Sequence, residues 1–554
     1  MKDVSRAAID DRHGRDVVIR VAGGALEGSV TPNGTVRMFK GVPYAAPPVG
    51  HLRWRPPVAV QPWSGVRAAL EFGPRCVQPS RPRNSIAYFG PERQSEDCLY
   101  LNVWTAARSS EDRLPVMVLF HGGGFRVGSG ALPIFNGEHL ARKGAVIVTV
   151  NYRLGKLGFL AHPELSAESE TGTSGNYGLL DQVAALRWVR QNIHAFGGDS
   201  ERVTLFGQSV GSSGASLHMS SPMTKGLFHR IIGQSGGFFG GVERNCGMGD
   251  ALQTLSDAEE SGRTFARIMG VSLVSELRGL PAEYIQMGLP GQSSDEFDPS
   301  TMPSGLFESA WPIVDGKFLA ECPASVFSRG AQNDVPLLTG SNENEGAIVP
   351  HAKSASEFVQ TVRREFGSTA EACLECYRAT TGEQAAESSA ALFADRSFGW
   401  HNWTWARLQR QTGRANAYLY RFSRASPIPS DAEYCEAEAN KFGAFHCAEI
   451  PYVFRTLDVR NWPWQAQDHQ LSETMSSFWI NFASSGNPNG PGLPSWPIFN
   501  ERTESIMRFG DEIKTVTLPD VDRFTFLEAY YNKVIGRSPL RSTHASRGMP
   551  GKTA

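Results

Sequence analysis

The sequence predicts an α/β protein with a largely parallel sheet. Two continuous apolar runs, 114–120 and 145–152, have the length and composition of strands that are buried on both faces of a sheet. Downstream, apolar residues recur at steps of three and four, which is the pattern of a buried helix face: Leu179, Leu180, Val183, Leu186, Val189 and Ile193. Strands that alternate with helices in this way favour parallel pairing, because each helix carries the chain back across the sheet.

The remaining elements follow in chain order. We expect antiparallel strands at 17–30 and 35–44, a strand at 202–206, a helix at 212–219, and further strands at 230–233 and 336–339.

Two polar, helix-prone stretches interrupt this alternation. We interpret residues 243–330 and 350–410 as insertions that cap the sheet, within one domain that spans 17–536. Residues 1–16 and 537–554 are polar and are expected to be terminal tails.

Composition excludes several classes of protein. Of the 554 residues, 41% are hydrophobic and 20% charged, which are ordinary globular values. The net charge is -2, so the chain lacks the excess of basic residues that is typical of nucleic-acid-binding proteins, and no nucleic-acid partner is expected. We expect a monomer or a homodimer.

The apolar segments are short. No run approaches the ~18 residues of a membrane span, so none is expected. The first residues contain no apolar signal-peptide region, which favours a cytoplasmic location for the sequence as written. A secreted or periplasmic location follows if the natural protein has a leader before it.

The eight cysteines are too dilute for a disulfide scaffold. Cys373 and Cys376 form a CxxC, but no second pair follows, and histidines at zinc-finger spacing and HExxH are missing. We therefore expect no metal and interpret this pair as thiols on a helix.

The sharpest local motif is GxSxG, which occurs twice, around Ser209 and around Ser235. A nucleophile elbow needs a strand before the serine and a helix after it. The expected strand 202–206 and helix 212–219 provide both for Ser209, whereas Ser235 is followed by the loop sequence GGFFGG. The context favours Ser209 as a nucleophile.

A second motif, His121-Gly-Gly-Gly-Phe125, directly follows the apolar strand 114–120. Consecutive glycines let backbone N–H groups approach a ligand oxygen without an intervening side chain, as in the oxyanion loops that accompany a nucleophile elbow. The alternative is a flexible turn, but the combination with GxSxG favours an oxyanion hole.

A serine nucleophile needs a base and a carboxylate that orients the base. Where the serine lies in a nucleophile elbow, the acid follows the serine along the chain, and the histidine follows the acid. Glu343 and Glu345 follow the expected strand 336–339, where catalytic residues of such sheets lie. The later histidines are His351, His401, His446, His469 and His544. The glycine and aromatic residues around His446 suit a loop at a pocket rim, although the residues alone leave the other histidines open.

A series of longer motifs extends over residues 38–510. It comprises FKGVPYAAPPVGHLRWRPP (39–57), SEDCLYLNVW (95–104), NYRLGKLGFL (151–160), GNYGLLDQVAALRWV (175–189), FGGDSERVTLFGQSVG (196–211), SNENEG (341–346), FHCAEIPYVF (445–454) and FWINFASSGNPNG (478–490). In these motifs the chain resembles the type-B carboxylesterase/lipase family. The resemblance implies an α/β-hydrolase fold: a large, mostly parallel central sheet, helices on both faces and helical cap insertions.

The resemblance also assigns roles. It implies Ser209 as nucleophile, Glu345 as acid and His446 as base. The oxyanion hole would be formed by the N–H groups of Gly123, Gly124 and Val210.

Two positions depart from the pattern of this family. Val210 stands where a small residue is usual, so its branched side chain is expected to narrow the acyl site. Gln208 stands where glutamate is common, which removes a negative charge and weakens the case for a cationic substrate.

The resemblance implies two structural ion pairs, Arg53 with Glu96 and Arg153 with Asp181. It also implies a disulfide between Cys76 and Cys98. The loop between these two cysteines contains Tyr88 and Phe89, which would line the substrate pocket or serve only as packing residues. Phe125, at the end of the glycine motif, is a further candidate for the pocket.

The expected activity is the hydrolysis of uncharged carboxylic esters through an acyl-enzyme. The expected partner is a small, apolar, uncharged ester, and no metal or organic cofactor is implied. An amidase or carbamate hydrolase would need the same triad and stays open. A non-catalytic, cholinesterase-like binding module is disfavoured, because all three triad positions are intact.

Overall fold

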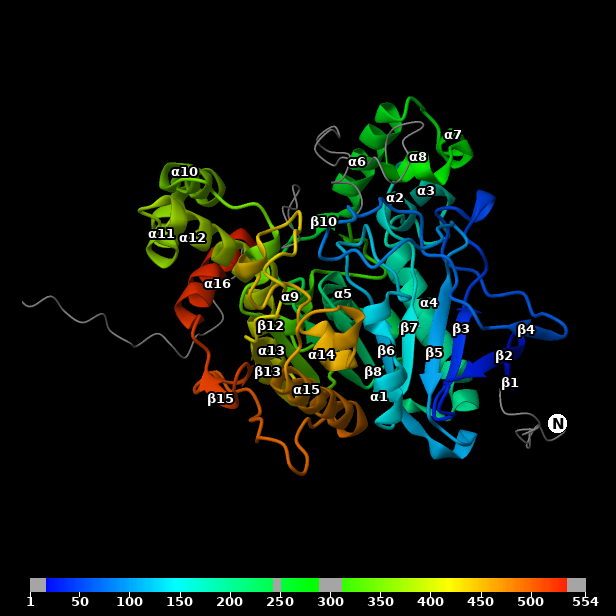
Figure 1. Cartoon of the computed structure of the whole chain (residues 1–554). Helices are drawn as coiled ribbons and strands as arrows, with labels where there is room; N and C mark the ends of the chain where they lie inside the picture. Colours follow the sequence, from blue (N-terminus) through cyan, green and yellow to red (C-terminus); the bar gives the residue numbers. More distant parts are fainter. Residues whose placement is uncertain (1–15, 243–250, 288–310, 536–554) are drawn as a thin grey trace, which may run out of the picture.

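One large mixed sheet forms the centre of the molecule (Figure 1). The computed structural model describes residues 16–242, 251–287 and 311–535. In this part of the chain, thirteen strands form the sheet in the order β1-β2-β3-β5-β7-β6-β8-β9-β12-β13-β14-β15, with β4 paired to β2. The strands from β7 to β14 in this order are parallel, whereas β1, β2, β3, β5 and β15 add antiparallel pairs at the two edges.

The bounds of the strands are β1 Asp16–Val21, β2 Gly24–Val30, β3 Arg37–Pro43, β4 Val66–Ala68, β5 Tyr100–Thr105, β6 Leu114–Phe120, β7 Val146–Val150, β8 Gly198–Gln208, β9 Arg230–Gln234, β12 Leu337–Asn342, β13 Ala417–Phe422, β14 Ser505–Phe509 and β15 Ile513–Thr517. A separate parallel pair consists of β10 Gln253–Thr254 and β11 Ile313–Val314.

The bounds of the helices are α1 Glu138–Arg142, α2 Gly155–Phe159, α3 Pro163–Glu168, α4 Tyr177–Asn192, α5 Val210–Ser220, α6 Leu255–Ile268, α7 Val274–Gly279, α8 Ala282–Met287, α9 Pro323–Ser328, α10 Ala355–Phe366, α11 Ala370–Cys376, α12 Gly382–Ala394, α13 Trp400–Thr412, α14 Ile450–Phe454, α15 Ala466–Ser485 and α16 Val521–Ile535.

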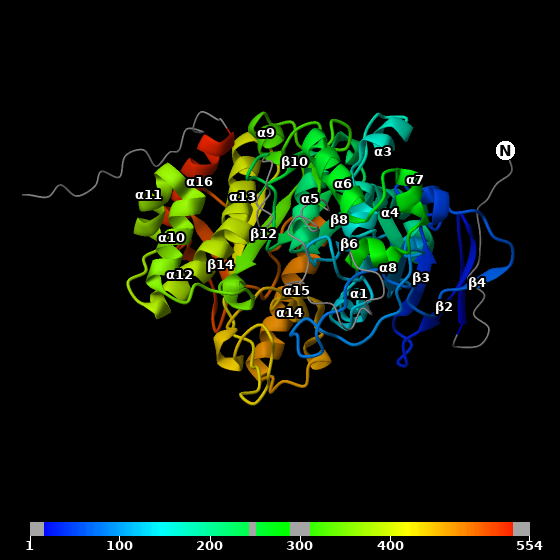
Figure 2. The same cartoon turned by 90° about the horizontal axis from the view of Figure 1, so that it is seen from above.

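Helices cover both faces of the sheet, as Figure 2 shows: α4, α5 and α13 lie on one face, and α1, α14 and α15 on the other. The sequence of β6 explains why both faces need cover. Its alternate residues belong to two separate apolar cores, Val116 and Val118 to one, Met117 and Leu119 to the other. Because side chains alternate along a strand, a continuous apolar run must be buried on both sides.

The expected elements are present with different bounds. The run 17–30 is two strands, β1 and β2, which pair with each other across a turn. The strand expected at 202–206 is the longer β8, and the helix at 212–219 begins earlier, as α5.

The second expected insertion is shorter than the range 350–410. Helices α10, α11 and α12 cluster with α16 beyond the last strands of the sheet (Figure 1). Helix α13, however, packs directly on β12 and β13, because its tryptophans Trp400, Trp403 and Trp405 are buried. The polar residues of α13 made this segment resemble an insertion in the sequence, although it is a helix of the core.

The first expected insertion, 243–330, is described only in part. It contributes α6, α7 and α8, and also α9, which packs on α5 and α13. Nearly all of the two expected tails, 1–16 and 537–554, lies outside the described residues.

Both ion pairs implied by the resemblance are present and enclosed. Arg153 Nη2 lies 2.7 Å from Asp181 Oδ1, with both side chains at 3% exposure or less. Burial raises the pKa of the Asp181 carboxyl, and Arg153 opposes that shift. Arg53 donates to Glu96 Oε1 at 2.7 Å and also to the carbonyl of Leu280, so it fastens the N-terminal segment to the helices around α7.

Candidate active site

Ser209 stands at a sharp turn between β8 and α5. Its backbone has φ 58° and ψ -130°, a conformation that is costly for a residue with a side chain. Two glycines make the turn sterically feasible. A Cβ on Gly207 would lie 2.4 Å from the carbonyl carbon of Gly211, and one on Gly211 would lie 2.0 Å from the carbonyl oxygen of Phe120. The strand–turn–helix context expected of a nucleophile elbow is therefore formed around Ser209.

The second GxSxG has similar backbone strain but a different environment. Ser235 has φ 53° and follows β9, but the next element that the structure describes after it is the strand β10, not a helix. Its side chain is fully buried, and its hydroxyl has no hydrogen-bond partner in the described structure. Ser209, by contrast, lines a cavity of about 1110 Å³. Only the first serine is accessible to a substrate.

The glycine motif after β6 lies beside Ser209. A Cβ on Gly122 would lie 2.9 Å from the Cβ of Ser209, and one on Gly123 would lie 1.9 Å from the carbonyl oxygen of Val127. The N–H groups of Gly123, Gly124 and Val210 have no backbone acceptor among the residues that the structure describes. They are the three donors that the resemblance assigns to the oxyanion hole.

Glu345 and His446 are joined by a hydrogen bond. His446 Nδ1 lies 2.5 Å from Glu345 Oε2, and both side chains are less than 10% exposed. Glu345 Oε1 accepts a further bond from the backbone N–H of Asn342, at the end of β12, at 2.7 Å. Glu343, the other acid considered from the sequence, is exposed. Of the two acids considered from the sequence, Glu345 is the one that contacts His446.

The other histidines lie elsewhere. His401 is fully buried on α13, where its Nδ1 accepts from the N–H of Phe239. His351 lies in a loop before α10, and His469 lies on α15. His544 is outside the described residues.

The electrostatic environment of His446 favours its charged form. Burial alone lowers the pKa of its imidazole, but Cys447 and Glu345 raise it, and the pKa lies well above its ordinary value. A base of this kind retains a proton firmly once it has accepted one.

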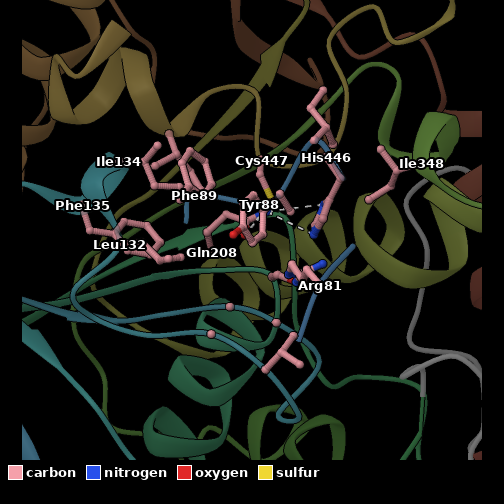
Figure 3. Close-up of a pocket in the computed structure, with 18 of the residues that line it drawn as sticks. Arg81, Tyr88, Phe89, Leu132, Ile134, Phe135, Gln208, Ile348, His446 and Cys447 are labelled. Atoms are coloured by element: carbon pink, nitrogen blue, oxygen red, sulfur yellow. Dashed lines mark hydrogen bonds between the residues drawn. The ribbon is translucent and has the colours of Figure 1, made fainter. Parts of the chain in front are cut away.

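Gln208 lies against the histidine. Its Nε2 is 3.2 Å from His446 Nε2, and its Oε1 accepts from the thiol of Cys447 at 3.2 Å (Figure 3). Among the described residues no direct hydrogen bond joins Ser209 to His446; the two side chains meet at the same cavity. Such bonds are often long without substrate and tighten in the Michaelis complex.

Two neighbours of the histidine were missed by the sequence analysis. The ring of Phe398 stacks on His446 with centroids 4.3 Å apart and planes inclined by 19°. No periodic pattern marks this residue. The buried carboxylate of Glu449 accepts from Asn342 Nδ2 at 2.7 Å and from Gln234 Nε2 at 3.0 Å. Burial and Glu345 raise the pKa of Glu449 to about 6. Glu449 lies within the motif 445–454, so its position was marked there without a role.

The cavity above Ser209 has a volume of about 1110 Å³ and is mainly apolar. Figure 3 shows a cluster of apolar side chains on one side of Gln208, with Ile348 on the other side beyond His446. The apolar lining residues include Phe89, Leu132, Ile134, Phe135, Ile348 and Phe445.

Two of the three tentative wall residues line this cavity. Tyr88 and Phe89 both do so, and the guanidinium of Arg460 lies 4.3 Å from the centre of the Phe89 ring. Phe125 does not: its ring is fully buried among other aromatic rings, including Phe159 at 5.0 Å. Placing Phe125 in the substrate pocket was therefore wrong.

Val210 also departs from its expected effect. Its side chain is buried in the apolar core on the α4 and α5 side of the sheet and does not line the cavity. The first residue of α5 therefore offers only its backbone N–H to the site, and the branched side chain does not narrow the pocket in this structure.

Two arginines of the cavity wall, Arg81 and Arg83, have no ion-pair partner among the described residues, and Arg81 is the one that has Cys447, next to His446, among its charged neighbours. The guanidinium of Arg81 is accessible within the cavity and has no ion-pair or hydrogen-bond partner in the described part of the chain. Enclosure by the protein lowers its pKa, although Cys447 and Glu436 raise it. The pocket thus carries a free positive charge near the histidine.

The cysteines implied as a disulfide lie together in the core. Cys76 and Cys98 are both buried and are present as free thiols. A hydrogen bond between the two side chains, together with burial, raises the pKa of Cys98. The pairing therefore stays a prediction. Cys373 and Cys376 lie on α11, as expected of thiols on a helix.

The comparisons with known proteins agree with this geometry. Residues 15–525 match the model of the carboxylesterase family. The chain belongs to this family. Its α/β-hydrolase fold is shared by the solved structure of a PNB esterase, which has a TM-score of 0.77 and 32% sequence identity and covers 92% of this chain and 99% of that one.

Among curated carboxylesterase relatives, the fumonisin B1 esterase of Sphingopyxis macrogoltabida is 37% identical over 88% of this chain and 86% of its own length. The para-nitrobenzyl esterase of Bacillus subtilis is 34% identical over 90% of this chain and 96% of its own length. The cocaine esterase of Homo sapiens is 33% identical over 86% of this chain and 84% of its own length.

This carboxylesterase is accordingly a serine hydrolase that acts on carboxylic esters. Within the described residues, no helix combines the length and the apolar character that crossing a bilayer requires.

Proposed function

We propose that this carboxylesterase cleaves small, apolar esters through an acyl-enzyme, with Ser209 as nucleophile, His446 as base and Glu345 as the group that orients the base. The single observation that carries the proposal is the meeting of an elbow serine and a glutamate-bound histidine at one apolar cavity.

The reaction follows from these positions. His446 removes the proton of the Ser209 hydroxyl as its oxygen attacks the ester carbonyl, and the carbonyl π electrons move onto the oxygen. The imidazolium then donates this proton to the departing alcohol. A water molecule, deprotonated by the same histidine, releases the carboxylic acid and restores the serine.

The negative oxygen of the tetrahedral intermediate needs donors that are already in place. The N–H groups of Gly123, Gly124 and Val210 lie around Ser209 and are not engaged with other backbone groups in the described structure. Each such donor contributes on the order of 3 kcal/mol to lowering the barrier.

The cavity supports an apolar, uncharged group next to the scissile bond. Its wall around Gln208 is made of aromatic and aliphatic side chains, and Gln208 itself is neutral. Amide hydrolysis would use the same residues but needs stronger protonation of the leaving group.

We expect a burst of chromophore from an activated aryl ester such as para-nitrophenyl acetate, equal to one equivalent of enzyme, because acylation releases the phenol before the acyl-enzyme is hydrolysed. Rapid-quench or stopped-flow absorbance measures the burst. The matched para-nitroanilide should be cleaved at least about a hundredfold more slowly. Equal rates on both would favour an amidase, and the absence of any turnover would contradict the proposal.

We also expect discrimination against cationic acyl groups. Two para-nitrophenyl esters are compared, one with a terminal tert-butyl group on the acyl chain and one with the isosteric trimethylammonium group. The neutral ester should have about tenfold higher kcat/KM, because Arg81 repels the cation. The two carboxylates of the cavity wall are already engaged, Glu92 with Arg75 and Glu436 with Ser85, so they compensate little for the desolvation of the cation.

Measurement at low and high salt separates long-range repulsion from contacts in the pocket. Arg81→Gln should narrow the difference, whereas Arg108→Gln, which changes the net charge equally at an exposed position, should not. A preference for the cation that persists at high salt would overturn this interpretation of the pocket.

A further inference from the structure

We propose that Phe398 is a positioning residue for His446, and that the C-terminal helix α16 holds it in place. The inference rests on the proposed role of His446 as base. The observation is the stacked contact between the two rings, at 4.3 Å between centroids.

His446 needs support on its ring face. Glu345 is bonded to Nδ1, and Gln208 Nε2 lies 3.2 Å from Nε2, but both contacts are made to ring nitrogens and neither covers the face of the imidazole. The residue lies in a loop before the short helix α14, and the next residue, Cys447, has a positive φ of 79°. A ring that packs flat against the imidazole covers this face and directs Nε2 toward the cavity.

The stacked ring also acts on charge. When His446 accepts the proton of Ser209, it becomes an imidazolium beside the negative face of the Phe398 ring, which is a favourable cation–π contact. The other groups near His446 are the carboxyls of Glu345 and Glu449, the thiol of Cys447, the neutral Gln208 and the cationic Arg81 of the same cavity, which opposes the charged form. Phe398 therefore adds to the stabilisation that Glu345 gives the charged form.

The backbone that carries Phe398 is unusual. Residues Asp395–Gly399 form a π-helical turn between α12 and α13. Such turns are rare and occur often at functional sites, because they displace a side chain from its helical position. Here the turn directs Phe398 toward the histidine, while the helix continues along the sheet as α13.

Helix α16 anchors this turn. The buried carboxylate of Asp395 lies 2.8 Å from Arg523 Nε and accepts from the hydroxyl of Tyr377 at 2.9 Å. A Cβ on Gly399 would come within 2.8 Å of the ring of Phe524, so the turn and the helix are in close contact.

A second contact lies one residue further along. Trp400 stacks on Tyr531 of α16 with centroids 4.3 Å apart. The path from α16 to His446 is therefore short: an ion pair and packed rings hold the turn, and the turn holds Phe398.

The test is a set of three variants of the full chain. Phe398→Leu keeps an apolar side chain but removes the ring, and we expect kcat to fall about tenfold to a hundredfold with KM within twofold. Phe398→Tyr keeps the ring and should retain activity within about threefold. Phe39→Leu removes a buried ring of β3 that packs on Phe196, towards the opposite edge of the sheet from α16, and should leave kcat unchanged.

The pH profile distinguishes a loss of the contact with His446 from a general loss of stability, because a variant that is only less stable keeps the pKa of the histidine. Removing the ring destabilises the imidazolium, so the pKa of His446 falls and the acid limb of kcat/KM shifts to lower pH in Phe398→Leu. Phe39→Leu should keep the wild-type limb even if its melting temperature drops equally. An unchanged limb and kcat in Phe398→Leu would overturn the proposal.

Arg523→Gln tests the anchor. It removes the charge that faces Asp395 without touching the histidine, and it should reproduce part of the fall in kcat. Wild-type kcat in Arg523→Gln, with Phe398→Leu impaired, would retain the role of the ring and refute that of α16.

The outcome also separates this inference from the proposed function. If His446→Ala abolishes turnover while Phe398→Leu is unaffected, only the positioning role fails. If His446→Ala remains active, the assignment of the base fails.

Discussion

Ser209→Ala should lower kcat by at least about 10⁴-fold and abolish covalent labelling by a fluorophosphonate. The reason is the strained elbow, which presents the hydroxyl of this serine to the cavity. Labelling is measured by intact-protein mass, and turnover by release of para-nitrophenol.

Ser235→Ala is the matched control. This serine has the same flanking motif and a similar φ, but its hydroxyl is buried and outside the cavity. The variant should label like the wild type. Labelling that survives Ser209→Ala and disappears in Ser235→Ala would reverse the assignment.

Glu345→Gln should lower kcat by about 10³- to 10⁴-fold, because an amide neither fixes the tautomer of His446 nor stabilises its imidazolium. The pH profile should change as well. Glu345 helps to raise the pKa of His446, so its removal lowers that pKa. Since the base is active when neutral, the acid limb of kcat/KM should move to lower pH.

The control for this variant lies two residues away. Glu343→Gln removes the same charge from the same loop, but the side chain is exposed and has no contact with the histidine in the described structure. It should retain kcat and the acid limb. A loss of activity in Glu343→Gln comparable to that in Glu345→Gln would indicate that the charge of the loop matters, and not the bond to His446.

The sequence predicted the central part of the fold well, because buried parallel strands have continuous apolar runs that few other elements share. The runs 114–120 and 145–152 are β6 and β7, and the periodic helix is α4. Helix α13 was assigned to an insertion because its polar residues mask a face of buried tryptophans. The spacing of apolar and polar residues along a sequence indicates which face of a helix is buried. It does not indicate which element that face packs against.

The site was predictable where a residue is required by backbone geometry or by a motif. The glycines around Ser209 and in the loop after β6 are required because neighbouring backbone atoms lie too close to leave room for a Cβ. They can therefore be recognised as a motif in the sequence. Phe398 and Arg81 leave none. Each acts through a side chain that meets the histidine or the cavity from a segment remote in sequence, and only tertiary structure brings them there.

The assembly of the site from distant segments has a consequence for biosynthesis. The proposed nucleophile, Ser209, precedes the proposed base, His446, by 237 residues along the chain (446 minus 209). At roughly 5–20 residues per second, the ribosome adds this length in about 10–50 s. During that interval the nascent chain already contains the elbow serine and the glycine loop, but it lacks His446, the proposed base. If His446 is the base, we therefore expect Ser209 to gain hydrolytic activity only after the segment that carries His446 has been made and has folded.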